Sequence, residues 1–130
     1  QVKQGLRQIG STFKPFLYAT AIDQLKLSPC DSLPDALYCI EPMKHGNMDA
    51  WCPKNSGDKY GRTRTLKNAL ANSVNTISAR IMDLVGPRPV INLARKMGIT
   101  SNLPAVPSIA LGTPDISLFE MVGAYSTFAN

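Results

Sequence analysis

The sequence has no long apolar run, a single histidine and few aromatic residues, and each shortage excludes a class of function. No stretch approaches the roughly 20 consecutive apolar residues that cross a membrane as a helix. Aromatic residues make up 7% of the chain and are not interleaved with basic ones, so the stacking surface of a nucleic-acid-binding module is missing. His45 is the only histidine and the cysteine spacing does not suit zinc, so we expect neither a metal site nor a cofactor.

The residues that are present are typical of a globular domain. Apolar residues are 44% of the 130, which is enough for one domain with a modest core. The net charge is +5, but the 14 basic residues are scattered along the sequence. This pattern indicates a solvated surface and no nucleic-acid partner. His45, in a polar stretch beside Gly46, is expected to be a loop residue.

Three cysteines leave one thiol over if a disulfide forms within the chain. Cys39 and Cys52 flank a polar segment that contains Gly46, and a disulfide is well suited to close such a loop. We therefore expect these two to be the favoured pair, with Cα atoms about 4.4–6.8 Å apart. The alternative is that the cysteines are small buried apolar residues.

Ser11 and Lys14 have a spacing that suits nucleophilic chemistry. Three residues apart on a helix, they lie on one face, so the Lys14 amine can reach the Ser11 hydroxyl. A serine hydroxyl needs a base to become a good nucleophile, and a lysine in a dry pocket can be that base. The same spacing occurs by chance in many proteins, and the alternative is that Ser11 is a simple helix N-cap.

A second polar pair, Ser73 and Asn75, follows far downstream. Two residues apart in an extended or turning segment, a hydroxyl and an amide can point the same way. They then offer a proton relay and a substrate-binding group. Alone, this pair is also typical of helix ends and turns. An S-x-x-K followed by an S-x-N is a much sharper signal than either motif by itself.

Apolar periodicity predicts a mostly helical chain. Helices are expected at 12–25, from 65 onward, and at 76–85, 89–97 and 117–129. The first is apolar nearly all round, which indicates deep burial. The stretch 27–64 is rich in proline and glycine and is expected to be irregular, with at most a short strand at 38–40, and 102–113 is expected to be a loop. The last helix is expected to turn Leu118, Met121, Val122 and Tyr125 inward.

Four stretches resemble the transpeptidase domain of class A penicillin-binding proteins, the bifunctional type that also carries a glycosyltransferase. They are 7–16 (RQIGSTFKPF), 51–55 (WCPKN), 65–75 (TLKNALANSVN) and 110–121 (ALGTPDISLFEM), the last continuing to YSTFAN at 125–130. The last stretch favours class A over the monofunctional class B enzymes and over β-lactamases. The resemblance implies one incomplete transpeptidase domain, 1–130, with the nucleophile helix and the helical subdomain.

The same resemblance implies a D,D-transpeptidase that cross-links peptidoglycan stem peptides and is the target of β-lactam antibiotics. Ser11 matches the nucleophile that attacks a stem peptide ending in D-Ala-D-Ala, and Lys14 matches the group that takes its proton. Ser73 matches the hydroxyl that relays a proton to the leaving amine. Asn75 matches the amide that holds Lys14 and the substrate backbone. An amine acceptor on a second stem peptide then resolves the acyl-enzyme.

The family's third motif, K-T-G, is absent, and the chain opens on Gln1 without a start methionine. We therefore expect a piece of a larger, membrane-anchored protein that works on the periplasmic or extracytoplasmic face of the bacterial inner membrane. The expected fold class is mostly α, a partial fragment of the α+β β-lactamase/transpeptidase-like fold without most of its central sheet. Without that sheet, we expect the isolated chain to be inactive and to self-associate through the apolar faces of helix 12–25.

Two other functions stay open at this point. A non-enzymatic penicillin-sensing or interaction module of the same fold would carry the same helices. A serine β-lactamase would need a carboxylate that activates water, and Asp115 and Glu120 are present but not in a recognisable setting. Rapid acylation by a penicillin followed by slow release would support a transpeptidase, fast turnover a β-lactamase, and no labelling a binding module.

Overall fold

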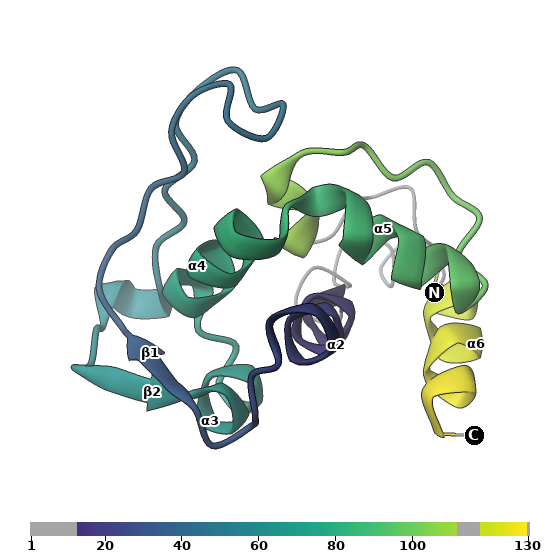
Figure 1. The fold of residues 1–130 in the computed structure, drawn as a ribbon, viewed down its shortest axis with the longest axis horizontal. Coiled ribbons are helices and arrows are strands. Elements are labelled where there is room, and N and C mark those ends of the chain that lie inside the picture. The colour runs from purple at the N-terminus through teal and green to yellow at the C-terminus, as the bar shows by residue number, and fades with distance from the viewer. Residues whose placement is uncertain (1–12, 112–117, 130) are drawn as a thin grey trace.

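Helices make up most of the regular structure in the computed structural model, which describes residues 13–111 and 118–129. This confirms the mostly helical fold class. Ser11 and Asp115 lie outside the described residues. The elements in chain order (Figure 1) are α2 (Lys14–Leu25), β1 (Ser32–Pro34), η2 (Ser56–Asp58), β2 (Thr63–Thr65), α3 (Leu66–Ala71), α4 (Asn75–Val85), α5 (Pro87–Lys96), η3 (Pro107–Leu111) and α6 (Leu118–Ala129).

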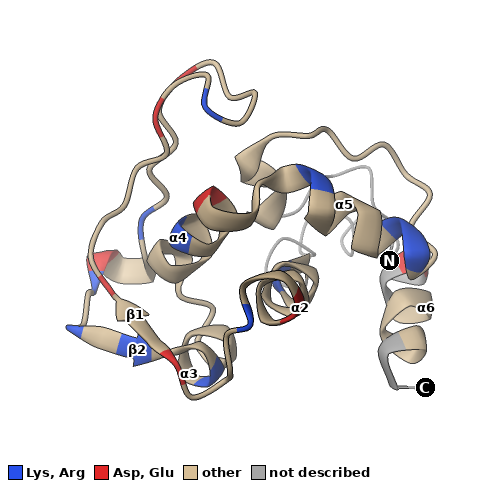
Figure 2. Ribbon diagram, viewed as in Figure 1, with Lys and Arg blue, Asp and Glu red and all other residues tan. Residues whose placement is uncertain are grey.

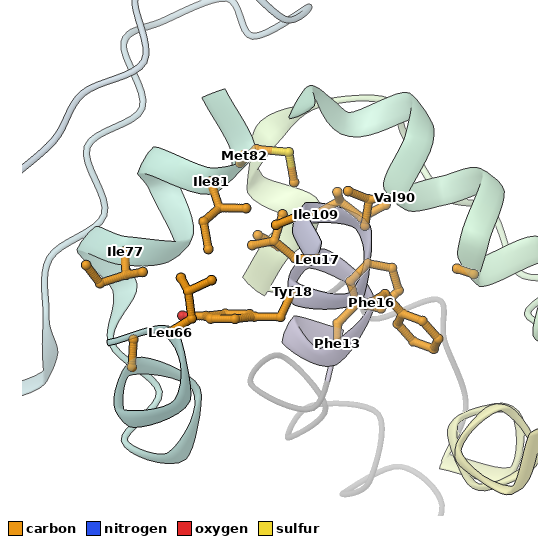
Figure 3. Packing of buried hydrophobic residues seen from close by; sticks show 14 of the residues in the cluster. Phe13, Phe16, Leu17, Tyr18, Leu66, Ile77, Ile81, Met82, Val90 and Ile109 are labelled. Carbon is orange, nitrogen blue, oxygen red and sulfur yellow. The ribbon is translucent and has the colours of Figure 1, made fainter. Parts of the chain in front are cut away.

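Helix α2 lies at the centre of the fold. It contacts α3, α4, α5 and η3, and Figure 1 shows these elements around it. Its apolar side chains enter one cluster that Leu66, Ile81, Val90 and Ile109 complete from the four neighbouring elements (Figure 3). Full burial of one such side chain stabilises a fold by about 1.5–3 kcal/mol. This cluster therefore determines where the first turns of α2 lie.

The burial of α2 is deep up to Ala21 and shallow over its last four residues. Phe13, Phe16, Leu17 and Ala21 are fully buried, whereas Ile22 is 41% exposed. The expectation of burial nearly all round is thus right up to Ala21 but wrong for 22–25. The expectation that the chain leaves the apolar faces of this helix uncovered is wrong for most of the residues involved, because α3, α4, α5 and η3 pack over them. Self-association of the isolated chain stays a prediction, but an uncovered apolar face of α2 no longer supports it.

A short antiparallel ribbon forms where irregular chain was expected. Strand β1 pairs with β2 in the register Ser32↔Thr65, Leu33↔Arg64 and Pro34↔Thr63. Strands of three residues are too short to show an alternating apolar pattern, so the sequence did not reveal them. The expected strand at 38–40 is reduced to a single bridge between Ile40 and Trp51. The ribbon leads directly into α3, where the Thr65 hydroxyl accepts a hydrogen bond from the Asn68 N–H at 3.1 Å.

A disulfide joins Cys39 and Cys52, which confirms the expected pair. Their Cα atoms are 4.3 Å apart, just below the usual range. Beside the bridge, Ile40 and Trp51 exchange two backbone hydrogen bonds of 2.9 and 3.0 Å. The two features together close the stem of the loop 41–50. Cys30 is free and exposed, so the alternative of buried cysteines is wrong.

Asp83 of α4 attaches this loop to the helical part of the fold. Its carboxylate accepts hydrogen bonds from the Tyr38 hydroxyl and from Lys44 Nζ, the latter at 3.2 Å, and lies 2.9 Å from His45 Nε2. His45 is therefore a loop residue, as expected, and its ring connects the loop to α4. Among the residues that the structure describes, no group of three His, Cys, Asp or Glu side chains is placed to hold a metal ion.

Replacing Cys52 with serine is expected to lower the free energy of unfolding by about 2–3 kcal/mol. The bridge joins residues 13 positions apart, and a cross-link of this length restricts the unfolded chain by about that amount. Urea unfolding of the purified protein measures the change. Cys30→Ser, which alters an exposed free thiol, is the matched control. An equal loss in both variants would contradict the role given to the bridge.

Some helix boundaries and one orientation differ from expectation. Helix α5 begins at Pro87 and not at Pro89, because Gly86, with a φ of 75°, ends α4 and leads directly into α5. The expected loop at 102–113 contains the short helix η3. On α6, Val122 is 56% exposed and does not point inward, whereas Tyr125 stacks against Phe16 with ring centroids 6.3 Å apart. The side chains of Leu118 and Met121 lie outside the described part.

Candidate active site

Lys14 lies in the first turn of α2, and its amine contacts both members of the S-x-N pair. Lys14 Nζ donates to Ser73 Oγ at 2.9 Å, to the Ser73 carbonyl oxygen at 3.0 Å and to Asn75 Oδ1 at 2.6 Å. The fold thus brings together three of the four residues that the two motifs singled out, across 59 and 61 positions of sequence. The fourth, Ser11, lies outside the described residues.

The Lys14 side chain is almost completely buried, with 1% of the residue exposed. Phe13 and Phe16 beside it are also fully buried and pack with ring centroids 4.9 Å apart. Burial lowers the pKa of Lys14 from 10.5 to about 8. About one amine in ten is then neutral at pH 7, against fewer than about one in a thousand at the ordinary pKa. A neutral amine can accept a proton from a hydroxyl group, and an ammonium cannot.

The shape of the Ser73–Asn75 corner comes from the junction between α3 and α4. Ser73 has a φ of 53°, in the left-handed region, and Val74 is extended, with φ −79° and ψ 113°. The Val74 side chain is buried in the core, and its N–H donates to the Ala69 carbonyl at 2.9 Å. The packing of Val74 offsets the strain of a left-handed serine. The side chains on either side of Val74 both reach Lys14.

Asn75 is held from a second side. Its Nδ2 donates to the Lys54 carbonyl at 2.7 Å, while its Oδ1 accepts from Lys14. Because an amide has one donor end and one acceptor end, these two bonds together determine its orientation. Lys54 lies in the stretch 51–55, so this stretch has a structural role beside the site.

A buried carboxylate, Asp35, lies behind the corner, and no sequence pattern indicated it. Its oxygens accept hydrogen bonds of 2.6–2.8 Å from Asn55 Nδ2, Thr76 Oγ1, Arg64 Nε and the Gly61 N–H. Burial alone would raise the pKa of Asp35, but the bonds from Arg64, Thr76, Gly61 and Asn55 outweigh it and hold the pKa well below its usual range. Rules based on short spacings in the sequence cannot predict this group, because its members lie 20 to 41 positions from Asp35.

A small polar cavity of about 200 Å³ adjoins the corner. It is lined by Asn55, Ser56, Lys59, Arg64, Asn72, Ser73 and Val74. Larger hollows of about 420 and 350 Å³ lie at the α4–α5 junction and between α2 and α5, but neither includes Lys14 or the S-x-N pair. Lys14 and the S-x-N pair therefore lie outside these two larger hollows.

Charged residues are scattered through the described part of the chain. Figure 2 shows Lys and Arg on α2, β2, α3, α4 and α5 and in the loops, with Asp and Glu between them. This agrees with the solvated surface expected from the sequence.

The helices that the structure describes are too short to span the hydrocarbon core of a bilayer.

The sequence matches a known family over almost its whole length. The penicillin binding protein transpeptidase domain matches residues 4–130. The chain belongs to this family. The transpeptidase family resemblance seen in the separate motifs thus extends through the helices and loops that connect them.

Relatives named penicillin-binding protein 1A are similar to this chain over almost all of its length. The protein from Neisseria meningitidis serogroup A is 39% identical over 128 residues, and that from Aquifex aeolicus is 35% identical over 129, in each case 98% of this chain. The crystal structure of penicillin-binding protein 1A from Haemophilus influenzae matches 93% of this chain with a TM-score of 0.78 at 30% identity, which shows the same fold. The chain spans 16–18% of the length of these proteins.

Proposed function

We propose that this chain is the part of a peptidoglycan D,D-transpeptidase that carries the serine nucleophile and its proton-transfer groups. The observation that carries the proposal is the contact of the buried Lys14 amine with Ser73 Oγ and Asn75 Oδ1, at 2.9 and 2.6 Å. The lowered pKa of Lys14, about 8, supports its use as a base. Membership of the transpeptidase family and the name of the relatives support the same class of reaction.

In the proposed acylation, neutral Lys14 takes the proton of Ser11 while the serine oxygen attacks the carbonyl carbon of the penultimate D-alanine. The tetrahedral intermediate then breaks its C–N bond. The leaving D-alanine amine receives a proton from the Ser73 hydroxyl, and Ser73 regains one from the Lys14 ammonium. The 2.9 Å contact between Lys14 Nζ and Ser73 Oγ supports this relay, because a hydroxyl can accept one proton while it donates another.

The second half of the proposed reaction uses the same groups in reverse. An amine on a second stem peptide attacks the Ser11 ester, loses a proton through Ser73 to Lys14, and forms the cross-link. The proton then returns to the Ser11 oxygen as it leaves. A penicillin is expected to acylate the same serine and to be released slowly, which makes β-lactams inhibitors.

We place this site in a longer protein. The chain spans about one sixth of its relatives, and we propose that the K-T-G strand, a glycosyltransferase domain and a membrane anchor lie in the remainder. The site then lies on the periplasmic or extracytoplasmic side of the bacterial inner membrane, and residues 1–130 form an incomplete transpeptidase domain. The family resemblance implies that a backbone N–H beside K-T-G donates to the oxyanion of the tetrahedral intermediate. Without that donor, the rate of the isolated chain is expected to fall by about 10²–10³-fold.

A fluorescent penicillin applied to the full-length protein tests the proposal. We expect one stable label per chain, its loss in Ser11→Ala, and release of D-alanine from a stem pentapeptide. Ser108→Ala, at an exposed position of η3, is the control and is expected to label normally. Fast turnover of the penicillin would indicate a β-lactamase, and stable labelling without D-alanine release would indicate a sensor. Absence of labelling would overturn the proposal.

A further inference from the structure

The buried carboxylate of Asp35 is saturated with donors. Asp35 Oδ1 accepts from Asn55 Nδ2 at 2.8 Å and from Thr76 Oγ1 at 2.6 Å. Asp35 Oδ2 accepts from the Gly61 N–H at 2.8 Å and from Arg64 Nε at 2.6 Å. Asp35 itself is 0% exposed. A buried charge costs free energy unless it is paired and hydrogen-bonded. The four donors therefore stabilise the charged form of the carboxylate.

Two of these partners lie directly beside the proposed active site. Asn55 Oδ1 accepts the Thr76 N–H at 3.0 Å, and the preceding residue, Lys54, accepts Asn75 Nδ2 at 2.7 Å. Consecutive residues of the loop thus hold consecutive residues at the start of α4. The residue at the N-cap position, Val74, makes no side-chain capping bond. The loop therefore supplies a cap that the helix sequence lacks.

The position of this loop depends on Asp35. The Asp35 carboxylate binds the Asn55 amide from one side and the Thr76 hydroxyl from the other. It thereby fixes the distance between the loop and the first turn of α4. Ser73 and Asn75 lie at the start of that turn, so a shift of the turn would move both. A shift there would lengthen the contacts of 2.9 and 2.6 Å to Lys14.

We propose that Asp35 and Asn55 are positioning residues for acyl transfer, which set Ser73 and Asn75 against Lys14 and keep water away from its amine. This inference rests on the proposed function. Neither residue touches the Lys14 amine, so both act through the start of α4. Among the described residues, the side chains that contact Lys14 Nζ are neutral, and the ion pairs involve other groups. Burial of the amine, to which Ser73 and Asn75 contribute by their contacts, is therefore what lowers the pKa of Lys14.

Thr76→Val in the full-length protein tests this inference. Valine has nearly the shape of threonine but removes the hydroxyl donated to Asp35, and the backbone bond to Asn55 stays possible. We expect penicillin acylation to slow by about 10- to 100-fold, the size of effect that a small misplacement produces. We also expect the midpoint of the pH–rate profile to move up from about 8 towards 10.5 as water reaches Lys14. Thr76→Ser, which restores a hydroxyl, is expected to recover most of the rate and the midpoint.

A matched control separates positioning from general stability. Ile99→Val shortens a fully buried side chain after α5, and it is expected to lower the melting temperature while the pH midpoint stays in place. If Thr76→Val fails to fold, Arg64→Met is the second variant. It removes the hydrogen bond to the same carboxylate from its more exposed side and is expected to raise the midpoint of the pH–rate profile in the same way. An unchanged midpoint in the folded variant would overturn the inference. A wild-type protein that is not acylated at all would instead overturn the proposed function.

Discussion

Replacing Lys14 with methionine in the full-length protein is expected to slow acylation of Ser11 by a penicillin by about 10²–10⁴-fold. Methionine is flexible, apolar and of similar length, so it suits the buried start of α2. It cannot accept a proton, and the Ser11 hydroxyl then has no base within the motif. The rate of labelling by a fluorescent penicillin measures the loss.

The pH dependence of the unmodified protein checks the same assignment independently. Because burial lowers the pKa of Lys14 to about 8, the neutral fraction of the amine rises through that pH. The acylation rate is expected to rise with it. Lys96→Met changes an exposed lysine on α5 and is expected to preserve both rate and midpoint. A Lys14→Met variant that is labelled as fast as the unmodified protein would remove Lys14 from the mechanism.

Replacing Asp35 with asparagine is expected to lower the free energy of unfolding at neutral pH by about 3 kcal/mol, the lower end for breaking a buried ion pair. All four groups around the carboxylate are donors. An asparagine NH₂ is also a donor, so some of the four lose their acceptor. The Arg64 side chain is 28% exposed, and its access to water limits the loss. Urea unfolding of both proteins measures the difference.

The cost of this substitution is expected to shrink in acid. The pKa of Asp35 is lower in the folded protein than its usual 3.8, so the unfolded chain takes up the proton first as the pH falls. The stability that the charged carboxylate contributes is therefore complete above about pH 4 and is lost progressively below it. Unfolding measured near pH 7, 5 and 3 should give equal differences at the first two values and a smaller one at the third. A difference that stays constant down to the lowest pH would show that the charge of Asp35 has no part in the effect.

Short-range patterns in the sequence predicted more of this protein than their length suggests. Ser73 and Asn75 are close enough in sequence that local geometry alone can place the pair on one side of the chain, and both contact Lys14. Helix α4 was predicted nearly to its ends, because apolar residues recur at helical spacing and Gly86 stops it. The Cys39–Cys52 bridge was predicted because it closes a short loop, and loop closure depends on local chain length.

The features that the sequence did not predict depend on contacts between segments that are far apart in the chain. The three-residue strands β1 and β2 form because 31–35 and 62–66 meet in the fold, and neither has a strand pattern of its own. The exposure of Ile22 and Val122 was not predicted either. Each lies on an apolar helix, and which face of such a helix is covered depends on its neighbours. Asp35 was missed for the same reason, since its partners come from three separate segments.

By itself, the sequence predicted the chemical groups of the proposed site, most of the helices and the transpeptidase family to which the chain belongs. Only the tertiary structure decided that Lys14 is buried, that its amine contacts Ser73 and Asn75, and that Asp35 and Asn55 both hydrogen-bond Thr76 next to this corner. The physical reason is that the pKa of a lysine depends on what surrounds it. Those surroundings exist only once α3, α4 and α5 have packed against α2.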